Sequence, residues 1–233
     1  MDLIKWPFLK QSWGMEVVKS EGPYLYTKEG QKILDAAGGA IVSNIGYGRE
    51  EVAEAVKQAT KNNSYVLPPF LTPERESLLD ELREHWLPSH LTRIHLSSGG
   101  SEANESAIKL AIQYQASRGK PEKNMILTRT LSYHGTTLNM SGISGHTARK
   151  RGLESYVPKA PMIEKPYPLR CPLGSFHPDA KDYYLNNLKE VLEEVGPENI
   201  AGLLMEPISG SSGGAISPPE GYWEEVQKIL IDN

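Results

Sequence analysis

The chain has 233 residues, of which 39% are hydrophobic and 23% are charged, and its formal net charge is −4. This composition is typical of a globular protein with one large domain, or one domain with an arm, and it gives no support for nucleic-acid binding. The single cysteine excludes an intrachain disulfide, and neither a signal peptide nor an apolar run of ~20 residues is found, so we expect a cytoplasmic protein without a membrane span.

The N-terminal part of the sequence predicts an arm, a hairpin and a helix. Residues 1–20 are aromatic and mixed, without a clean helical period, which fits an exposed arm. Residues 24–27 and 32–35 flank a Glu-Gly pair and predict a β-hairpin. After a glycine-rich loop, apolar residues at helical spacing predict a helix over residues 49–59.

The central part predicts a βαβ unit, which is the signature of a parallel sheet with covering helices. Thr72 and Pro73 form a strong helix start, and this helix is expected to run to about Trp86. Three elements follow in order: a strand over 93–97, a helix over 102–117 and a strand over 125–128.

The last part continues the alternation of helices and strands. Residues 156–180 contain six prolines and predict an ordered excursion without regular structure. A helix is expected over 182–195 and a strand over 200–205. A turn at 218–222 then precedes a final helix that begins near Trp223.

A glycine-rich turn between the strand at 93–97 and the next helix is the first candidate site. Such a turn presents unpaired backbone N–H groups and the positive end of the helix dipole, which together bind phosphate. The alternative is a tight turn in which Ser101 is an ordinary N-cap. The histidines show no metal-ligand spacing, so we expect no metal site.

Two later residues and one arginine also have alternative interpretations. Tyr133, in a Ser-Tyr-His-Gly-Thr stretch, is in isolation an aromatic residue packed in a loop. Glu206 follows a buried strand, where ligands bind in α/β sheets, but it is also placed to cap a neighbouring helix. Arg149 is either a ligand for a substrate carboxylate or a solvated surface residue.

These motifs, in this order, resemble the class III aminotransferases, which are pyridoxal-phosphate (PLP) enzymes of fold type I. The segments that carry the resemblance are Ser98–Glu105, Ser132–Thr136, Met205–Gly210, Leu34–Gly39 and Gly46–Gly48. The resemblance implies an α/β fold with a mixed, mostly parallel sheet flanked by helices. It places residues 1–60, with the arm and hairpin, in a small domain and residues 61–233 in a partial PLP-binding large domain.

The resemblance also implies a cofactor site for PLP. Its cofactor-binding residues are Gly100, Ser101, Glu102, Tyr133, His134 and Glu206. The first three would bind the phosphate through backbone N–H groups, helped by the Ser101 hydroxyl. Tyr133 would lie against the pyridine ring, His134 would shape the turn below it, and Glu206 would lie near the ring hydroxyl.

Transamination also needs a Schiff-base lysine and a carboxylate at the pyridine nitrogen. In the family both come later than the Glu-Pro segment, and no lysine of this chain matches the family position. We therefore expect the N-terminal half of an aminotransferase, inactive alone, which transfers an amino group between an amine or amino acid and a 2-oxo acid in its complete form. That form is expected to be a homodimer, or to be completed by a second, C-terminal chain.

Two other functions remain open from the residues alone. One is a catalytically dead remnant, or an interaction subunit, that retains a phosphate or PLP pocket. The other is an unrelated α/β protein that binds a phosphosugar on the same glycine-rich turn, against which the order of Tyr133 and Glu206 argues.

Overall fold

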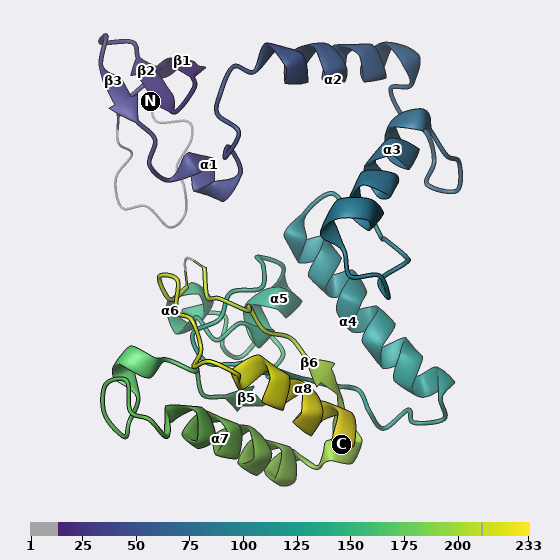
Figure 1. The fold of residues 1–233 in the computed structure, drawn as a ribbon, viewed down its shortest axis with the longest axis vertical. Helices are drawn as coiled ribbons and strands as arrows, with labels where there is room; N and C mark the ends of the chain where they lie inside the picture. The colour runs from purple at the N-terminus through teal and green to yellow at the C-terminus, as the bar shows by residue number, and fades with distance from the viewer. Residues whose placement is uncertain (1–13, 211) are drawn as a thin grey trace. The chain divides into compact units, whose positions relative to one another are not determined.

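The computed structural model describes residues 14–210 and 212–233, and the chain divides into two compact units with a boundary between Ile94 and His95 (Figure 1). In the first unit an antiparallel sheet has the strand order β1-β2-β3. Its strands are β1 (Val17–Glu21), β2 (Tyr24–Thr27) and β3 (Lys32–Leu34). The predicted hairpin is confirmed. Residues 1–13 of the expected arm lie outside the described residues. The last residues of the arm belong to β1, a strand that was not predicted.

The first unit continues with helices whose starts were readable from the sequence. They are α1 (Gly38–Ile41), α2 (Glu50–Asn62) and α3 (Pro73–Glu81), which continues into the π-helical turn η1 (Leu82–Trp86). Thr72 is the N-cap of α3, and its side chain accepts a hydrogen bond from the Arg75 N–H at 3.3 Å. The predicted helices over 49–59 and 72–86 are therefore confirmed. The glycine-rich loop contains α1, a single turn in which Gly38 to Ile41 all have positive φ.

In the second unit the described strands form a parallel sheet of order β5-β4-β6. They are β4 (Met125–Arg129), β5 (Met162–Ile163) and β6 (Ile200–Leu203). The Leu204 N–H donates to the Leu127 carbonyl at 2.8 Å, which fixes the register of β6 against β4. Because the strands are parallel, the segments that follow β4 and β6 leave the sheet at the same edge.

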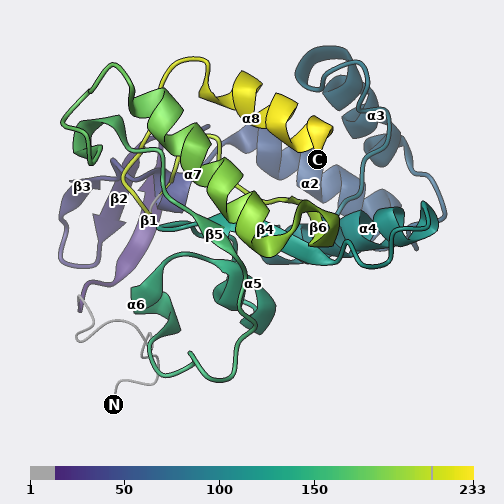
Figure 2. The same cartoon turned by 90° about the horizontal axis from the view of Figure 1, so that it is seen from below.

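Helices cover both faces of this sheet, with α7 and α8 on one face and α5 and α6 on the other (Figure 2). The helices of the unit are α4 (Gly100–Ser117), α5 (Leu138–Ile143), α6 (Thr147–Lys150), α7 (Ala180–Val195) and α8 (Tyr222–Asp232), with short 3₁₀ turns at Pro168–Arg170 and Pro197–Asn199. Tyr184, Leu188 and Leu192 recur every four residues along α7 and pack with Leu127 and Val226 in one buried core.

None of the described helices is both long and apolar enough to cross a membrane.

Two sequence predictions are wrong in this unit. Residues 93–97 form no strand, because no described strand lies beside them to take up their N–H and C=O groups. The parallel sheet predicted from that segment exists, but β5 and β6 build it around β4. The excursion over 156–180 was expected without regular structure, yet it contains β5, whose two residues are too short a signal for periodicity.

Leu188→Ala should destabilise the protein, because the side chain is fully buried and its removal leaves a cavity. We expect a loss of about 2–5 kcal/mol in the free energy of unfolding, measured by urea denaturation of the protein expressed from its complete gene. Leu169→Ala is the control, since Leu169 is 48% exposed, and should change stability by at most ~0.5 kcal/mol. Equal losses in the two variants would contradict the core described above.

Candidate functional site

The start of α4 leaves three backbone N–H groups without acceptors in the described residues. Gly99 is the N-cap, and the N–H groups of Gly100, Ser101 and Glu102 precede the first intrahelical bond, from Ala103 to the Gly99 carbonyl at 3.0 Å. The interpretation of Ser101 as the N-cap is therefore wrong. A Cβ atom built on Gly99 or Gly100 would meet no atom within 4 Å, so there is room beside the backbone at this helix start.

Two side chains one turn further along α4 connect it to the segment after β4. Asn104 Nδ2 donates to the His134 carbonyl at 2.7 Å. The Glu105 carboxylate accepts from Thr137 Oγ1 at 2.6 Å and from Asn139 Nδ2 at 2.8 Å. With Ser101 these residues lie at i, i+3 and i+4, on one face of the helix. The spacing of the Ser-Glu-Ala-Asn-Glu motif is thus explained by contact with the segment after β4.

Ser101 makes the connection closest to the helix start. Its Oγ accepts from the Thr136 N–H at 3.0 Å, which leaves the hydroxyl proton available to a ligand. Gly135 has φ +146°, and a Cβ there would lie 2.5 Å from Ser101 Oγ. Only glycine permits this approach of the turn to the helix.

Tyr133 lies between this turn and the segment after β6. Its backbone N–H donates to Glu206 Oε2 at 3.2 Å. Its half-buried ring faces the guanidinium of Arg149, with 4.5 Å between Arg149 Cζ and the ring centroid. Arg149 is therefore an exposed arginine that lies over the ring of Tyr133, and it forms no ion pair with a carboxylate of the described residues.

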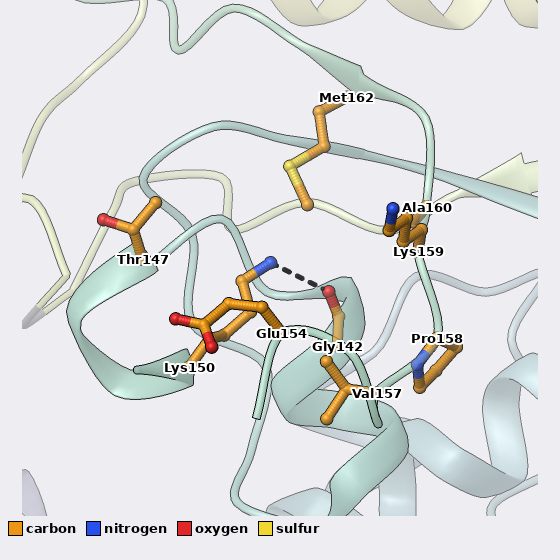
Figure 3. Close-up of a pocket in the computed structure, with 9 residues that line it drawn as sticks. All are labelled: Gly142, Thr147, Lys150, Glu154, Val157, Pro158, Lys159, Ala160 and Met162. Carbon is orange, nitrogen blue, oxygen red and sulfur yellow. Dashed lines mark hydrogen bonds between the residues drawn. The ribbon is translucent and has the colours of Figure 1, made fainter. Parts of the chain in front are cut away.

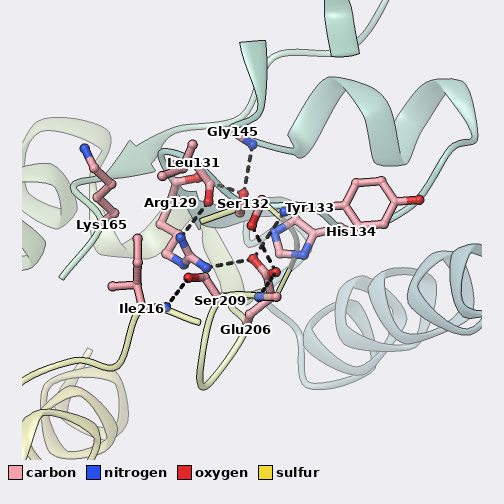
Figure 4. A network of polar contacts seen from close by, with 12 residues as sticks. Arg129, Leu131, Ser132, Tyr133, His134, Gly145, Lys165, Glu206, Ser209 and Ile216 are labelled. Carbon is pink, nitrogen blue, oxygen red and sulfur yellow. Dashed lines mark hydrogen bonds and ion pairs between the residues drawn. The ribbon is translucent and has the colours of Figure 1, made fainter. Parts of the chain in front are cut away.

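Glu206 accepts hydrogen bonds from both segments at the carboxyl edge of the sheet (Figure 4). Arg129 Nη2 donates to Glu206 Oε2 at 2.7 Å. The Gly210 N–H and Ser212 Oγ donate to Glu206 Oε1 at 3.1 Å and 3.3 Å. None of these donors is a helix N-terminus, so the interpretation of Glu206 as a helix cap is wrong.

Arg129 was missed by the sequence analysis. Its side chain is 2% exposed, and its Nη1 also donates to the carbonyls of Thr130 and Leu131 at 3.2 Å and 2.8 Å. Burial lowers the pKa of Arg129 from its ordinary value, and the charge of Glu206 opposes that shift. The sequence does contain a signal for Arg129. It is a charged residue at the end of the apolar strand β4, and a buried charge needs a partner.

His134 supports the turn from below. It is 5% exposed, its Nε2 lies 2.9 Å from Thr128 Oγ1, and its backbone N–H donates to Ser144 Oγ at 2.9 Å. Burial lowers the pKa of His134, with smaller and opposite effects from Glu206 and Arg129. A buried imidazole with these contacts positions the turn below Tyr133.

A separate cavity of about 500 Å³ lies between α6 and the chain that leads into β5 (Figure 3). Lys150 Nζ donates to the Gly142 carbonyl at 3.0 Å, and burial lowers the pKa of Lys150. None of the predicted cofactor-binding residues lines this cavity.

Comparison with known proteins identifies the family. The sequence matches the aminotransferase class-III family over residues 10–233. The chain belongs to this family. It is 34% identical over 217 residues to a probable aminotransferase of Mycobacterium tuberculosis. The aligned residues cover 91% of this chain and 46% of the relative. The chain spans about half the length of the curated relatives it matches.

Solved aminotransferase structures have the same fold. An (S)-enantioselective ω-transaminase from Thermomicrobium roseum superposes with a TM-score of 0.86 at 31% identity, over 94% of this chain and 48% of the other. A PLP-bound amine transaminase from an uncultivated Pseudomonas species gives a TM-score of 0.87 at 24% identity, over 99% and 53%, which supports the fold alone. The fold type I architecture implied by the motifs is confirmed.

Glu105→Ala should detach α4 from the segment after β4. Two hydrogen bonds to a carboxylate are lost and two donors are left without their partner, so we expect a loss of about 1–3 kcal/mol in the free energy of unfolding. Urea denaturation measures this loss, and Glu122→Ala, at an exposed position, is the control. An unchanged stability in Glu105→Ala would show that the connection is not made in solution.

The buried His134 should make stability depend on pH. Its pKa is lowered in the folded protein, so below the ordinary value near 6.5 the unfolded chain binds more protons than the folded one. The contribution of His134 to the free energy of unfolding should be complete above pH 6.5, and it should decrease as the pH falls toward the folded-state pKa. His134→Gln should remove this part of the slope between pH 7.5 and 5.5, and an identical slope in both proteins would contradict the assignment.

Proposed function

We propose that the chain is part of a PLP-dependent aminotransferase that moves an amino group from an amine or amino acid to a 2-oxo acid. One observation carries the proposal: three family motifs, far apart in the sequence, meet at the carboxyl edge of the parallel sheet. Ser101 bonds the turn after Tyr133, and Tyr133 bonds Glu206. Membership of the class-III family supports it.

The residues present fit the phosphate of PLP. The N–H groups of Gly100, Ser101 and Glu102 lie at the positive end of an 18-residue helix and have no acceptors in the described residues. There is room beside Gly99 and Gly100, and the Ser101 hydroxyl proton is free to donate. These groups would bind a phosphate dianion without any basic side chain. When bound, PLP supplies an electron-withdrawing ring that stabilises negative charge on the substrate carbon.

The other site residues would orient and shield the ring. Tyr133 presents a half-buried aromatic face that excludes water from one side, and its backbone is fixed by Glu206. His134 would shape the site by holding the turn from below through Thr128. The carboxylate of Glu206 is already balanced by Arg129, so its role is to accept hydrogen bonds that place the surrounding backbone.

The groups that carry out proton transfer are proposed to lie outside these 233 residues. The chain spans about half of its relatives, and we place the Schiff-base lysine and the carboxylate for the pyridine nitrogen in the remainder. That remainder follows in the same polypeptide or comes from a complementary chain, and the complete protein is a cytoplasmic homodimer. Residues 1–60 belong to its small domain and residues 61–233 to its large domain.

The proposal is tested by PLP titration of the protein expressed from its complete gene, followed by tryptophan fluorescence and absorbance, together with an assay of amino transfer to a 2-oxo acid. Gly100→Val fits the backbone, because its Cβ position is empty, but it fills the phosphate space. We expect PLP affinity to fall about ten- to a hundredfold, as for the loss of one or two hydrogen bonds to a charged group.

Ala103→Val is the matched control, since the Ala103 N–H is already bonded within the helix. It should leave PLP affinity unchanged. A wild-type protein that does not bind PLP would disprove the proposed function. A protein that binds PLP but transfers no amino group would instead favour a dead remnant that retains the pocket.

A further inference from the structure

Arg129 is the one buried residue at the carboxyl edge of the described sheet that carries a positive charge and touches Glu206. It lies two residues after Leu127 on β4, so its side chain leaves the same face as Leu127 and enters the side of the sheet that α8 covers. The guanidinium reaches back to Glu206 and to two carbonyls of its own segment. Its position is therefore determined by three acceptors.

The contact with Glu206 places a second group. Glu206 Oε2 accepts from both Arg129 Nη2 and the Tyr133 N–H, at 2.7 Å and 3.2 Å. The Oε1 atom accepts from Gly210 and Ser212 instead. A carboxylate held on one oxygen by Arg129 therefore presents the same oxygen to the backbone of Tyr133, as Figure 4 shows.

We propose that Arg129 is a positioning residue of the coenzyme site, which acts through Glu206 to fix the ring of Tyr133 against the coenzyme. This inference rests on the proposed function. Arg129 contacts no residue of the phosphate turn. Its described side-chain partners are the carbonyls of Thr130 and Leu131 and the carboxylate of Glu206, and only Glu206 bonds the backbone of Tyr133. A shift of about 1 Å in a group that shapes a site changes its function by about a hundredfold.

The experiment is a double-mutant cycle on PLP affinity in the protein expressed from its complete gene. The variants are Arg129→Met, Glu206→Gln and the combination of both, with Arg151→Met as the control at an exposed arginine. PLP affinity is read by absorbance and by the fluorescence of Trp223, whose Nε1 donates to the Pro207 carbonyl next to Glu206. Urea denaturation is run in parallel, because Arg129→Met leaves a buried carboxylate without its charged partner.

Arg129→Met is expected to weaken PLP binding about ten- to a hundredfold, and to have a much smaller effect in the Glu206→Gln background, where its bonds to the Thr130 and Leu131 carbonyls are the contacts that remain to be lost. Arg129→Lys keeps the charge and should recover part of the affinity. The double variant removes both charges, so it keeps the test valid if Arg129→Met fails to fold.

Equal losses of affinity in both backgrounds would overturn the inference, because Arg129 would then not act through Glu206. Wild-type affinity in a folded Arg129→Met would also overturn it and leave the proposed function intact. A wild-type protein that does not bind PLP would disprove the proposed function, and this inference, which rests on it, would be disproved as well.

Discussion

The ion pair between Arg129 and Glu206 joins two strands of the parallel sheet at the edge where the candidate site lies. Two ions removed from water are stabilised only when their remaining hydrogen bonds are also satisfied. Arg129 meets this condition with two backbone carbonyls, and Glu206 meets it with the backbone of Tyr133 and Gly210. The cost of burying the charges is thus offset by contacts that fix the backbone on both sides. The position of Tyr133 is a consequence of this arrangement.

The opposite side of the site is built without a buried ion pair. The start of α4 is held by Asn104, Glu105 and Ser101, which bond the same segment that carries Tyr133. Its free N–H groups and the helix dipole provide positive potential in a chain whose net charge is −4. In the proposed site an anion is recognised by backbone geometry, so Gly100 and Gly135 matter more than any lysine or arginine. The segment 129–139 therefore has an ion pair on one side and the proposed phosphate-binding end of α4 on the other.

The local features of this structure could be predicted from the sequence, and the long-range ones could not. The cap at Thr72 and the helix start near Gly100 depend on neighbouring residues, and both were predicted. The pairing of Arg129 with Glu206 joins residues 77 positions apart, and no period or motif records it. Glu206 itself was found because its motif belongs to a known family, whereas Arg129 has no such motif. The two residues of β5 take their structure from β4 and not from their own pattern.

The segment 93–97 shows how far a local pattern depends on its surroundings. Alternating residues around Ile94 favour a strand, but a strand exists only beside another strand, and the described chain places none there. Two other features belong with this result. No residue of α4 is buried against the described chain, and its apolar residues Leu110 and Tyr114 are 67% and 54% exposed. In addition, β6 is an edge strand of the described sheet. An apolar helix surface and an open sheet edge are stabilised when further strands cover them.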